Sequence, residues 1–208
     1  MLLIAITAQP ARADGLQSLE DFVKKTQSGR AAFTQVVTGP AREGQATKTK
    51  TSSGNFEFLR PNRFAFLYKK PFEQSLVADG QTLWMHDVEL NQVTARKLAQ
   101  VLNGTPAAVI AAAADIKGLQ ADFNLTALPD QGGLQWVKAV PKSKDGQLQS
   151  ISVGFRASAA GSELAALEIL DSFGQRSLMT FTRFEVNPAF SASHFQYKPP
   201  AGADLIRQ

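Results

Sequence analysis

The chain has 208 residues, of which 44% are hydrophobic and 9% aromatic, so it can form one sizeable domain with a packed core rather than a disordered segment. It contains no cysteine, which excludes disulfides, thiolate nucleophiles, zinc-thiolate sites and an N-terminal lipidated cysteine. Its formal net charge of +4 is compatible with an acidic membrane face or partner but is too small to indicate nucleic-acid binding.

The first thirteen residues have the features of an export signal. An apolar run extends from Leu2 to Ala8, and Ala11-Arg12-Ala13 has the small-x-small spacing that signal peptidases cut. No basic residue lies between Met1 and the apolar run. Two alternatives therefore stay open: the true start codon lies further upstream, or the segment is the start of an ordinary buried helix. We expect a signal peptide over residues 1–13 and a single exported domain over residues 14–208, without the roughly 18 consecutive apolar residues of a membrane span.

The mature region is expected to begin with an amphipathic helix. Asp14 can cap its start, and Gly29 is a plausible stop. Its polar side carries Glu20, Lys24 and Lys25. Its apolar side is formed by Leu16, Leu19, Phe22 and Val23.

From Arg30 onward, short alternating runs are separated by turn residues, a pattern typical of antiparallel strands. In one run Phe56, Phe58 and Arg60 share a face, and in the next Phe64, Phe66 and Tyr68 do. Asp79-Gly80-Gln81 is a hairpin signal. The expected strands cover residues 33–38, 46–51, 56–60, 64–68, 75–78, 82–86, 92–98, 123–128, 134–140, 149–155, 164–170, 177–186 and 194–198.

A second helix is expected in the middle of the chain. Thr105 and Pro106 are typical of an N-cap and a first-turn proline, and the alanine-rich run at 107–114 ends near Asp115. Burial of apolar surface stabilises a fold by about 25 cal/mol per Å², and small side chains bury little of it. This helix should therefore be displaced more easily than one that carries Leu or Phe. Together the elements predict one curved antiparallel sheet of roughly a dozen short strands with helices on its concave side.

The sequence offers little for catalysis. His86 and His194 are the only histidines, and each lies in an expected strand without a metal-binding or triad motif beside it. No pair of carboxylates suits general acid–base chemistry. We therefore interpret both histidines as ordinary strand residues and expect no enzyme activity, no cofactor and no metal site.

The stripe of apolar side chains has two interpretations. Its members either fill a closed core, the usual fate of such residues, or line a hydrophobic cavity that opens when the alanine-rich helix moves. The stripe consists of Phe56, Phe58, Phe64, Phe66, Tyr68, Leu83 and Met85. Arg60 shares a face with Phe56 and Phe58, and it either reaches solvent beside the turn or donates to backbone carbonyls of a covering element.

Five strings of residues occur in a specific order and spacing. They are Leu-Arg-Pro-Asn-Arg-Phe at 59–64, Leu-Val-Ala-Asp-Gly-Gln-Thr-Leu-Trp at 76–84, Leu-Asn-Gln-Val-Thr at 90–94, Leu-Asp-Ser-Phe-Gly-Gln at 170–175 and Phe-Gln-Tyr-Lys-Pro-Pro-Ala-Gly at 195–202. In this order the chain resembles the LolA family of outer-membrane lipoprotein carriers, from about Leu16 to Ile206. The high alanine content of the second helix and the basic second strand, with Lys48 and Lys50, depart from the family pattern.

The resemblance implies a mainly β fold with helices (α+β), in which an unclosed antiparallel half-barrel of about 11 strands is covered by an α-helical lid. It implies that Arg60 latches the closed lid by a hydrogen bond to the lid backbone, and that Phe64 faces the cavity. The lid helix would carry Pro106, Val109, Ile110 and Ala113. Loading of cargo would break the latch, and unloading would restore it.

The function implied is that of a monomeric periplasmic chaperone. It would bind the acyl chains of outer-membrane-directed lipoproteins, accept them from an ABC-type release complex of the inner membrane and deliver them to an outer-membrane receptor. Three other functions are to be compared with this one. Two of them stay open: a carrier or sensor of another lipid with the same half-barrel fold, and a lipid esterase. The third, the membrane-anchored receptor of related fold, would need the lipidated cysteine that the chain lacks.

Overall fold

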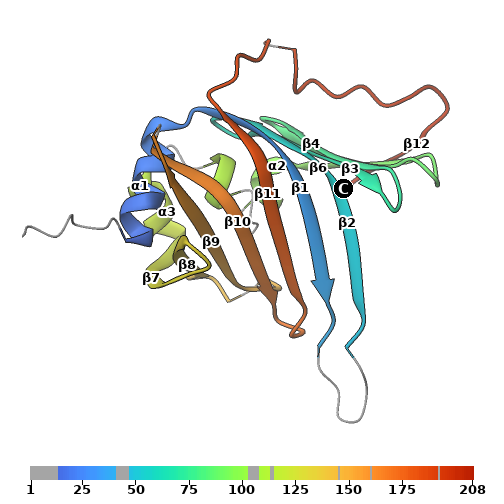
Figure 1. Ribbon diagram of the computed structural model, residues 1–208. Coiled ribbons are helices and arrows are strands. Elements are labelled where there is room, and N and C mark those ends of the chain that lie inside the picture. Colours follow the sequence, from blue (N-terminus) through green and yellow to red (C-terminus); the bar gives the residue numbers. More distant parts are fainter. Residues whose placement is uncertain are drawn as a thin grey trace, which may run out of the picture.

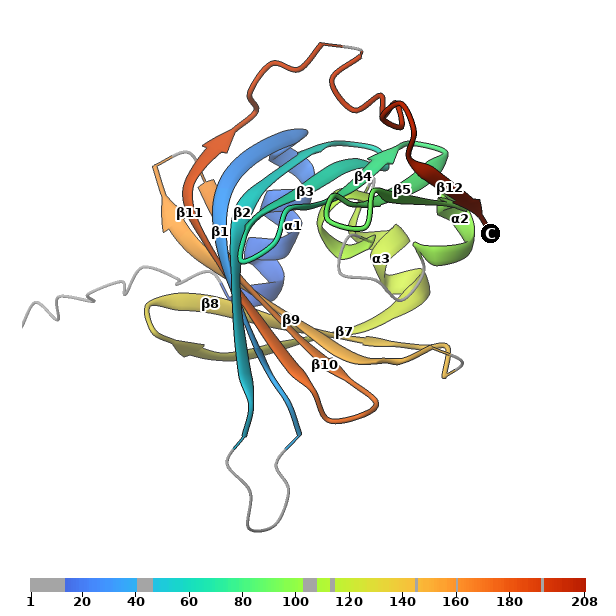
Figure 2. The ribbon, with the colours of Figure 1, turned by 90° about the vertical axis from the view of Figure 1, so that its right-hand side faces the viewer.

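The computed structural model describes residues 14–40, 47–102, 108–112, 115–144, 146–159, 161–191 and 193–208. The expected signal peptide lies outside these residues. One strongly curved sheet wraps around short helices on its concave face (Figure 1, Figure 2). The helical elements are α1 (Gly15–Lys25), α2 (Leu98–Val101), the π-helix η1 (Ala108–Ala112) and α3 (Ile116–Asp122). None of the helices in the described ranges is both long and apolar enough to cross a membrane.

Twelve strands within the described residues form one sheet that does not close on itself. They are β1 (Ser28–Thr38), β2 (Thr49–Leu59), β3 (Arg63–Lys70), β4 (Gln74–Asp79), β5 (Thr82–Asp87), β6 (Gln92–Lys97), β7 (Phe123–Gln131), β8 (Leu134–Pro141), β9 (Leu148–Ser158), β10 (Gly161–Asp171), β11 (Arg176–Val186) and β12 (Asp204–Arg207). Their order is β12-β6-β5-β4-β3-β2-β1-β11-β10-β9-β8-β7. The expected unclosed antiparallel sheet is confirmed, except that β12 pairs with β6 in parallel.

The first helix forms as predicted but ends earlier. The Asp14 side chain accepts a hydrogen bond from Gln17 N at 2.9 Å and so caps α1. The helix ends at Lys25 rather than at Gly29, which lies in β1. A Cβ at Gly29 would overlap the ring of Phe58, so this glycine is required by packing rather than by helix termination.

The strands expected at 46–51 and 56–60 are one continuous strand, β2. The Ser52-Ser53-Gly54 run between them resembles a turn in sequence. Gly54 instead sits inside the strand, where a Cβ would overlap the carbonyl of Leu67 in β3. The ladder shifts register beside it, so the glycine allows a close approach of β2 and β3.

The helical region differs most from the expectation. The strand expected to reach Leu98 ends at Lys97, and Leu98 begins α2. The helix expected over 107–114 is described only as the shorter η1, and Asp115, its expected end, is the N-cap of α3. The Asp115 side chain accepts from Gly118 N at 2.8 Å, which explains why a new helix starts there.

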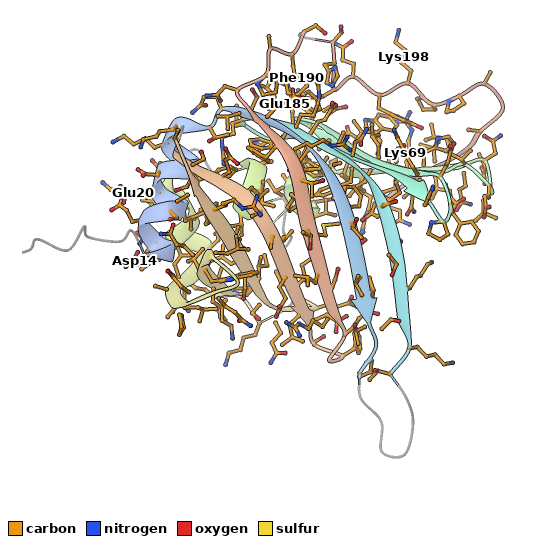
Figure 3. All side chains as sticks on the ribbon, in the orientation of Figure 1. Asp14, Glu20, Lys69, Glu185, Phe190 and Lys198 are labelled. Atoms are coloured by element: carbon orange, nitrogen blue, oxygen red, sulfur yellow. The ribbon has the colours of Figure 1, made fainter. Side chains whose placement is uncertain are left out.

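The strand expected over 194–198 does not form. From Asn187 to the start of β12 the chain instead crosses the convex face of the sheet, which we call the outer face; Phe190 and Lys198 mark its course (Figure 1, Figure 3). We refer to residues 187–207 as the C-terminal segment. Phe195 is 2% exposed because it packs on Ala65 and Val77 of the outer face. Apolar side chains of β3 and β4 are therefore covered on both faces of the sheet: by the core on the concave face and by the C-terminal segment on the outer face.

An ionic cluster fixes the C-terminal segment to the outer face. Glu57 of β2 lies 2.6 Å from His194 Nε2 and accepts from Arg30 Nε at 2.7 Å. Burial alone would raise the pKa of Glu57, but the hydrogen bonds from His194 and Arg30 outweigh it and hold the pKa below its ordinary value of 4.5.

Because the pKa of Glu57 is depressed in the folded chain, its contribution to stability is complete above the unfolded value and is lost as the pH falls through the folded value. We therefore expect the stability of the wild-type chain to fall more steeply between about pH 5 and pH 3 than that of Glu57→Gln. Urea unfolding at stepped pH measures both slopes. Glu185→Gln, which removes an exposed partner of Arg30, is the matched control, and parallel curves for Glu57→Gln and wild type would contradict the prediction.

Candidate functional site

An apolar cavity of about 230 Å³ lies on the concave face, between the strands β3–β5 on one side and β10–β11 on the other, with α2 beside it. Ten of its twelve lining residues are hydrophobic or aromatic without a polar atom; Gln35 and the hydroxyl of Tyr68 are the exceptions. The lining residues are Gln35, Phe64, Phe66, Tyr68, Leu76, Leu83, Leu98, Val101, Leu102, Leu167, Ile169 and Met179. Burial of the Tyr68 hydroxyl raises its pKa to about 12, so this group is neutral at physiological pH.

The structure divides the predicted stripe into three groups. Phe64, Phe66, Tyr68 and Leu83 line the cavity. Phe56 and Phe58 are fully buried behind it, where Phe56 stacks on Phe66 with ring centroids 4.5 Å apart. Met85 lies opposite Leu76 on the same face of the sheet but is 36% exposed at the rim and does not line the cavity.

Sequence reasoning missed the opposite wall and the cover formed by α2. Leu167 and Ile169 of β10 and Met179 of β11 complete the wall. Their alternate spacing in β10 is the signal that could have identified them, because i and i+2 share a strand face. Leu98 of α2 gave no such signal, since the strand pattern of β6 runs into it without a break.

Arg60 lies directly after β2 and is only 7% exposed. Its guanidinium carbon lies 5.4 Å from the ring centroids of Phe22 and Phe58, and its Nε donates to Thr26 O at 2.9 Å. Thr26 is the C-cap of α1, where the helix dipole favours a positive charge. Burial lowers the pKa of Arg60 from 12.5 to about 10, so the side chain stays charged at neutral pH.

One hydrogen bond of Arg60 thus goes to the end of α1. The expected contact with the backbone of the helix at 107–114 stays a prediction, because residues 103–107 and 113–114 lie outside the described residues. That helix is held by the neighbouring residue: Asn62 N donates to Ala111 O at 3.2 Å. Val109 and Ile110 of η1 are each 1% exposed and face the core, while Pro106 and Ala113 lie outside the described residues. The β2–β3 turn thus holds two covering elements, α1 through Arg60 and η1 through Asn62.

The Arg60 contact connects the two halves of the curved sheet. Arg60 follows β2 in one half, and α1 packs against β7–β10 in the other. Within the core Phe22 of α1 touches rings from both halves, Phe58 at 6.0 Å and Phe155 at 5.4 Å between centroids. Arg60 therefore ties the end of β2 to α1, which lies on the concave side of the curved sheet (Figure 2).

Both histidines lie away from the cavity. His86 is on the outer face of β5, near Tyr197 of the C-terminal segment, and His194 pairs with Glu57. Over the described ranges, no group of three or more His, Asp or Glu side chains is placed to hold a metal ion.

Comparisons with known proteins agree with this geometry. Residues 24–198 match the model of the family described as outer membrane lipoprotein carrier protein LolA. The chain is 67% identical to the outer-membrane lipoprotein carrier protein of Albidiferax ferrireducens, over 100% of this chain and 97% of the relative, and 51% identical to that of Methylibium petroleiphilum, over 99% and 95%. A solved structure of an uncharacterized conserved protein from Thermus thermophilus shares the fold at 12% identity, with a TM-score of 0.54 over 94% of this chain and 100% of that one.

Proposed function

The chain belongs to the family of the outer membrane lipoprotein carrier protein LolA, and from this premise we propose that it binds the acyl chains of lipoproteins in the cavity beneath α2 and carries them across the periplasm. The chain is a periplasmic lipoprotein chaperone by family. The observation that supports the proposed binding site is an almost wholly apolar cavity of about 230 Å³ under short helices.

The transport problem explains why such a cavity is needed. An acyl chain of about 15 methylenes costs on the order of 12 kcal/mol in water, at about 0.8 kcal/mol per methylene, so a lipid-anchored protein cannot cross an aqueous space unaided. Small-molecule sites usually measure roughly 300–1,000 Å³. Since the cavity is smaller than this range, the structure is the closed form in our proposal. The cavity enlarges for cargo when η1 and α1, which pack on the adjoining core rather than on the cavity wall itself, move aside.

The covering elements are suited to such movement. The buried side chains described in η1 are Val109, Ile110 and Ala111, so its displacement exposes less apolar surface than that of a Phe-bearing helix. Arg60 and Asn62 favour the closed state by holding α1 and η1. Loading breaks these contacts, and unloading restores them, so the empty protein recovers its closed form.

We propose two partners and one assembly state. An ATP-driven ABC-type complex of the inner membrane supplies the lipoprotein, and a receptor in the outer membrane accepts it. The carrier acts as a monomer, which suits one-to-one handover. The proposal includes no catalytic step, since both histidines lie on the outer side of the sheet, away from the bound chain, and we expect no hydrolysis of short acyl esters.

A release assay tests the function. Spheroplasts that hold newly made lipoproteins are incubated with and without the purified chain, and lipoprotein in the supernatant is measured. We expect soluble lipoprotein in a one-to-one complex with the chain. If no lipoprotein is released and another lipid is found in the cavity by mass spectrometry, the chain is a carrier or sensor of that lipid.

A further inference from the structure

The segment that accepts the Arg60 hydrogen bond is only four residues long. It runs from Lys25, the last residue of α1, to Ser28, the first of β1, and Thr26 provides the carbonyl that Arg60 Nε contacts at 2.9 Å. The backbone N–H of Arg60 donates to the next carbonyl, Gln27 O, at 2.8 Å. The β2–β3 turn therefore holds this short connection from one side.

Asn187 holds the same connection from the other side. Its Oδ1 accepts from Gln27 N at 2.7 Å and from Ser28 N at 3.2 Å, and its Nδ2 donates to Lys25 O at 2.9 Å. Its backbone N–H donates to Ser28 O at 2.9 Å. The amide group thus holds the connection at Lys25 and at Gln27, on both sides of Thr26.

The backbone of Asn187 is suited to this position. It directly follows β11 and has a φ of 54°, in the left-handed region that asparagine adopts more readily than most residues. The chain turns there from β11 onto the outer face, and Ser28 Oγ donates to the carbonyl of the following Pro188 at 2.7 Å. The turn that begins the C-terminal segment therefore places the Asn187 amide beside the α1–β1 connection.

We propose that Asn187 is a positioning residue for the Arg60 contact: it fixes the peptide groups on both sides of Thr26, so that the Thr26 carbonyl points at the guanidinium. A hydrogen bond weakens steeply once its donor–hydrogen–acceptor angle falls below about 120°, so a Thr26 carbonyl that is no longer held in place by Asn187 weakens the Arg60 bond although Arg60 itself is unchanged. This inference rests on the proposed function, in which that bond favours the closed cavity. It also links the start of the C-terminal segment to the opening of the cavity.

A double-mutant cycle tests the inference with a fluorescent palmitic acid analogue as the probe. Asn187→Gly removes the amide but tolerates the positive φ. We expect it to tighten probe binding by about threefold to tenfold when Arg60 is present, and by less than about twofold in the Arg60→Leu background, because the two residues act on one contact. Asn91→Gly is the matched control: Asn91 also has a positive φ, of 48°, and its side chain donates to Gly202 O near the far end of the C-terminal segment.

An NMR measurement separates positioning from a general loss of stability. The Arg60 Nε–H should exchange with solvent faster in Asn187→Gly and at the wild-type rate in Asn91→Gly. An equal effect of Asn187→Gly on probe binding in both backgrounds, or unchanged exchange of the Arg60 Nε–H, would overturn the inference alone. If Arg60→Leu itself binds the probe like wild type, the proposed latch fails instead.

Discussion

Replacing Arg60 with leucine is expected to tighten the binding of a fluorescent palmitic acid analogue by about tenfold and to slow its transfer to acceptor vesicles. In the proposed function only the open form accepts the chain, so the apparent dissociation constant is the intrinsic one divided by the open fraction. A change of about 1.4 kcal/mol in favour of the open form therefore gives a tenfold tighter complex. Titration of the probe and stopped-flow transfer measure the two effects.

The energetics of Arg60 explain why the effect is of this size. Burial lowers its pKa from 12.5 to about 10, so the closed form carries a desolvation cost for the charged side chain. The hydrogen bond to Thr26 returns about 1.5–3 kcal/mol, and the rings of Phe22 and Phe58 about 2 kcal/mol. Because the desolvation cost opposes these contacts, we expect the Arg60 contact to favour closure only modestly, so that a bound acyl chain can overcome it.

Arg63→Leu is the control for the loss of a positive charge. Arg63 lies three residues away, at the start of β3, and borders the Gly80 turn rather than the core. It should leave probe binding within about twofold of wild type. Equal probe affinity and equal transfer rates for Arg60→Leu and wild type would show that the Arg60 contact does not control the cavity.

Regular alternation made much of the sheet predictable. The period of two in Phe64-Ala65-Phe66 placed Phe64 and Phe66 on one face of β3, and the structure brings them together at the cavity wall. The Asp79 hairpin also forms, since its carboxylate accepts from Gln81 N and Thr82 N. In both cases local chemistry and the tertiary fold favour the same conformation.

The covering elements and the C-terminal segment were not predictable in this way. Asp115 can end one helix or cap the next, and the sequence does not decide between them. Phe195 and Tyr197 alternate like strand residues, but they form no strand and their side chains pack on the outer face. The contact between Arg60 and the Thr26 carbonyl depends on how α1 meets the β2–β3 turn. These two elements are more than 30 residues apart in the sequence, so no local pattern encodes the contact.

A carboxylate in the cavity wall is expected to abolish cargo binding without unfolding the chain. Leu76 of β4 is a half-buried wall residue, so in the empty protein the side chain of Leu76→Asp can keep water in the cavity beside it. An acyl chain would remove this water and leave the charge without a partner, at a cost of several kcal/mol. We expect probe affinity to fall by about tenfold to a hundredfold, and lipoprotein release from spheroplasts to fall with it.

Gln74→Asp separates this effect from the general cost of a carboxylate in β4. Gln74 is exposed two residues earlier in the same strand, so its replacement adds the same charge outside the cavity. Urea unfolding should show both variants folded at neutral pH. If Leu76→Asp is folded and binds the probe like Gln74→Asp, the acyl chain lies elsewhere. A selective loss of probe binding in Leu76→Asp would place the acyl chain against β4. Together with tighter binding in Arg60→Leu, it would show that Leu76 contacts the bound chain, whereas Arg60 controls the opening of the cavity.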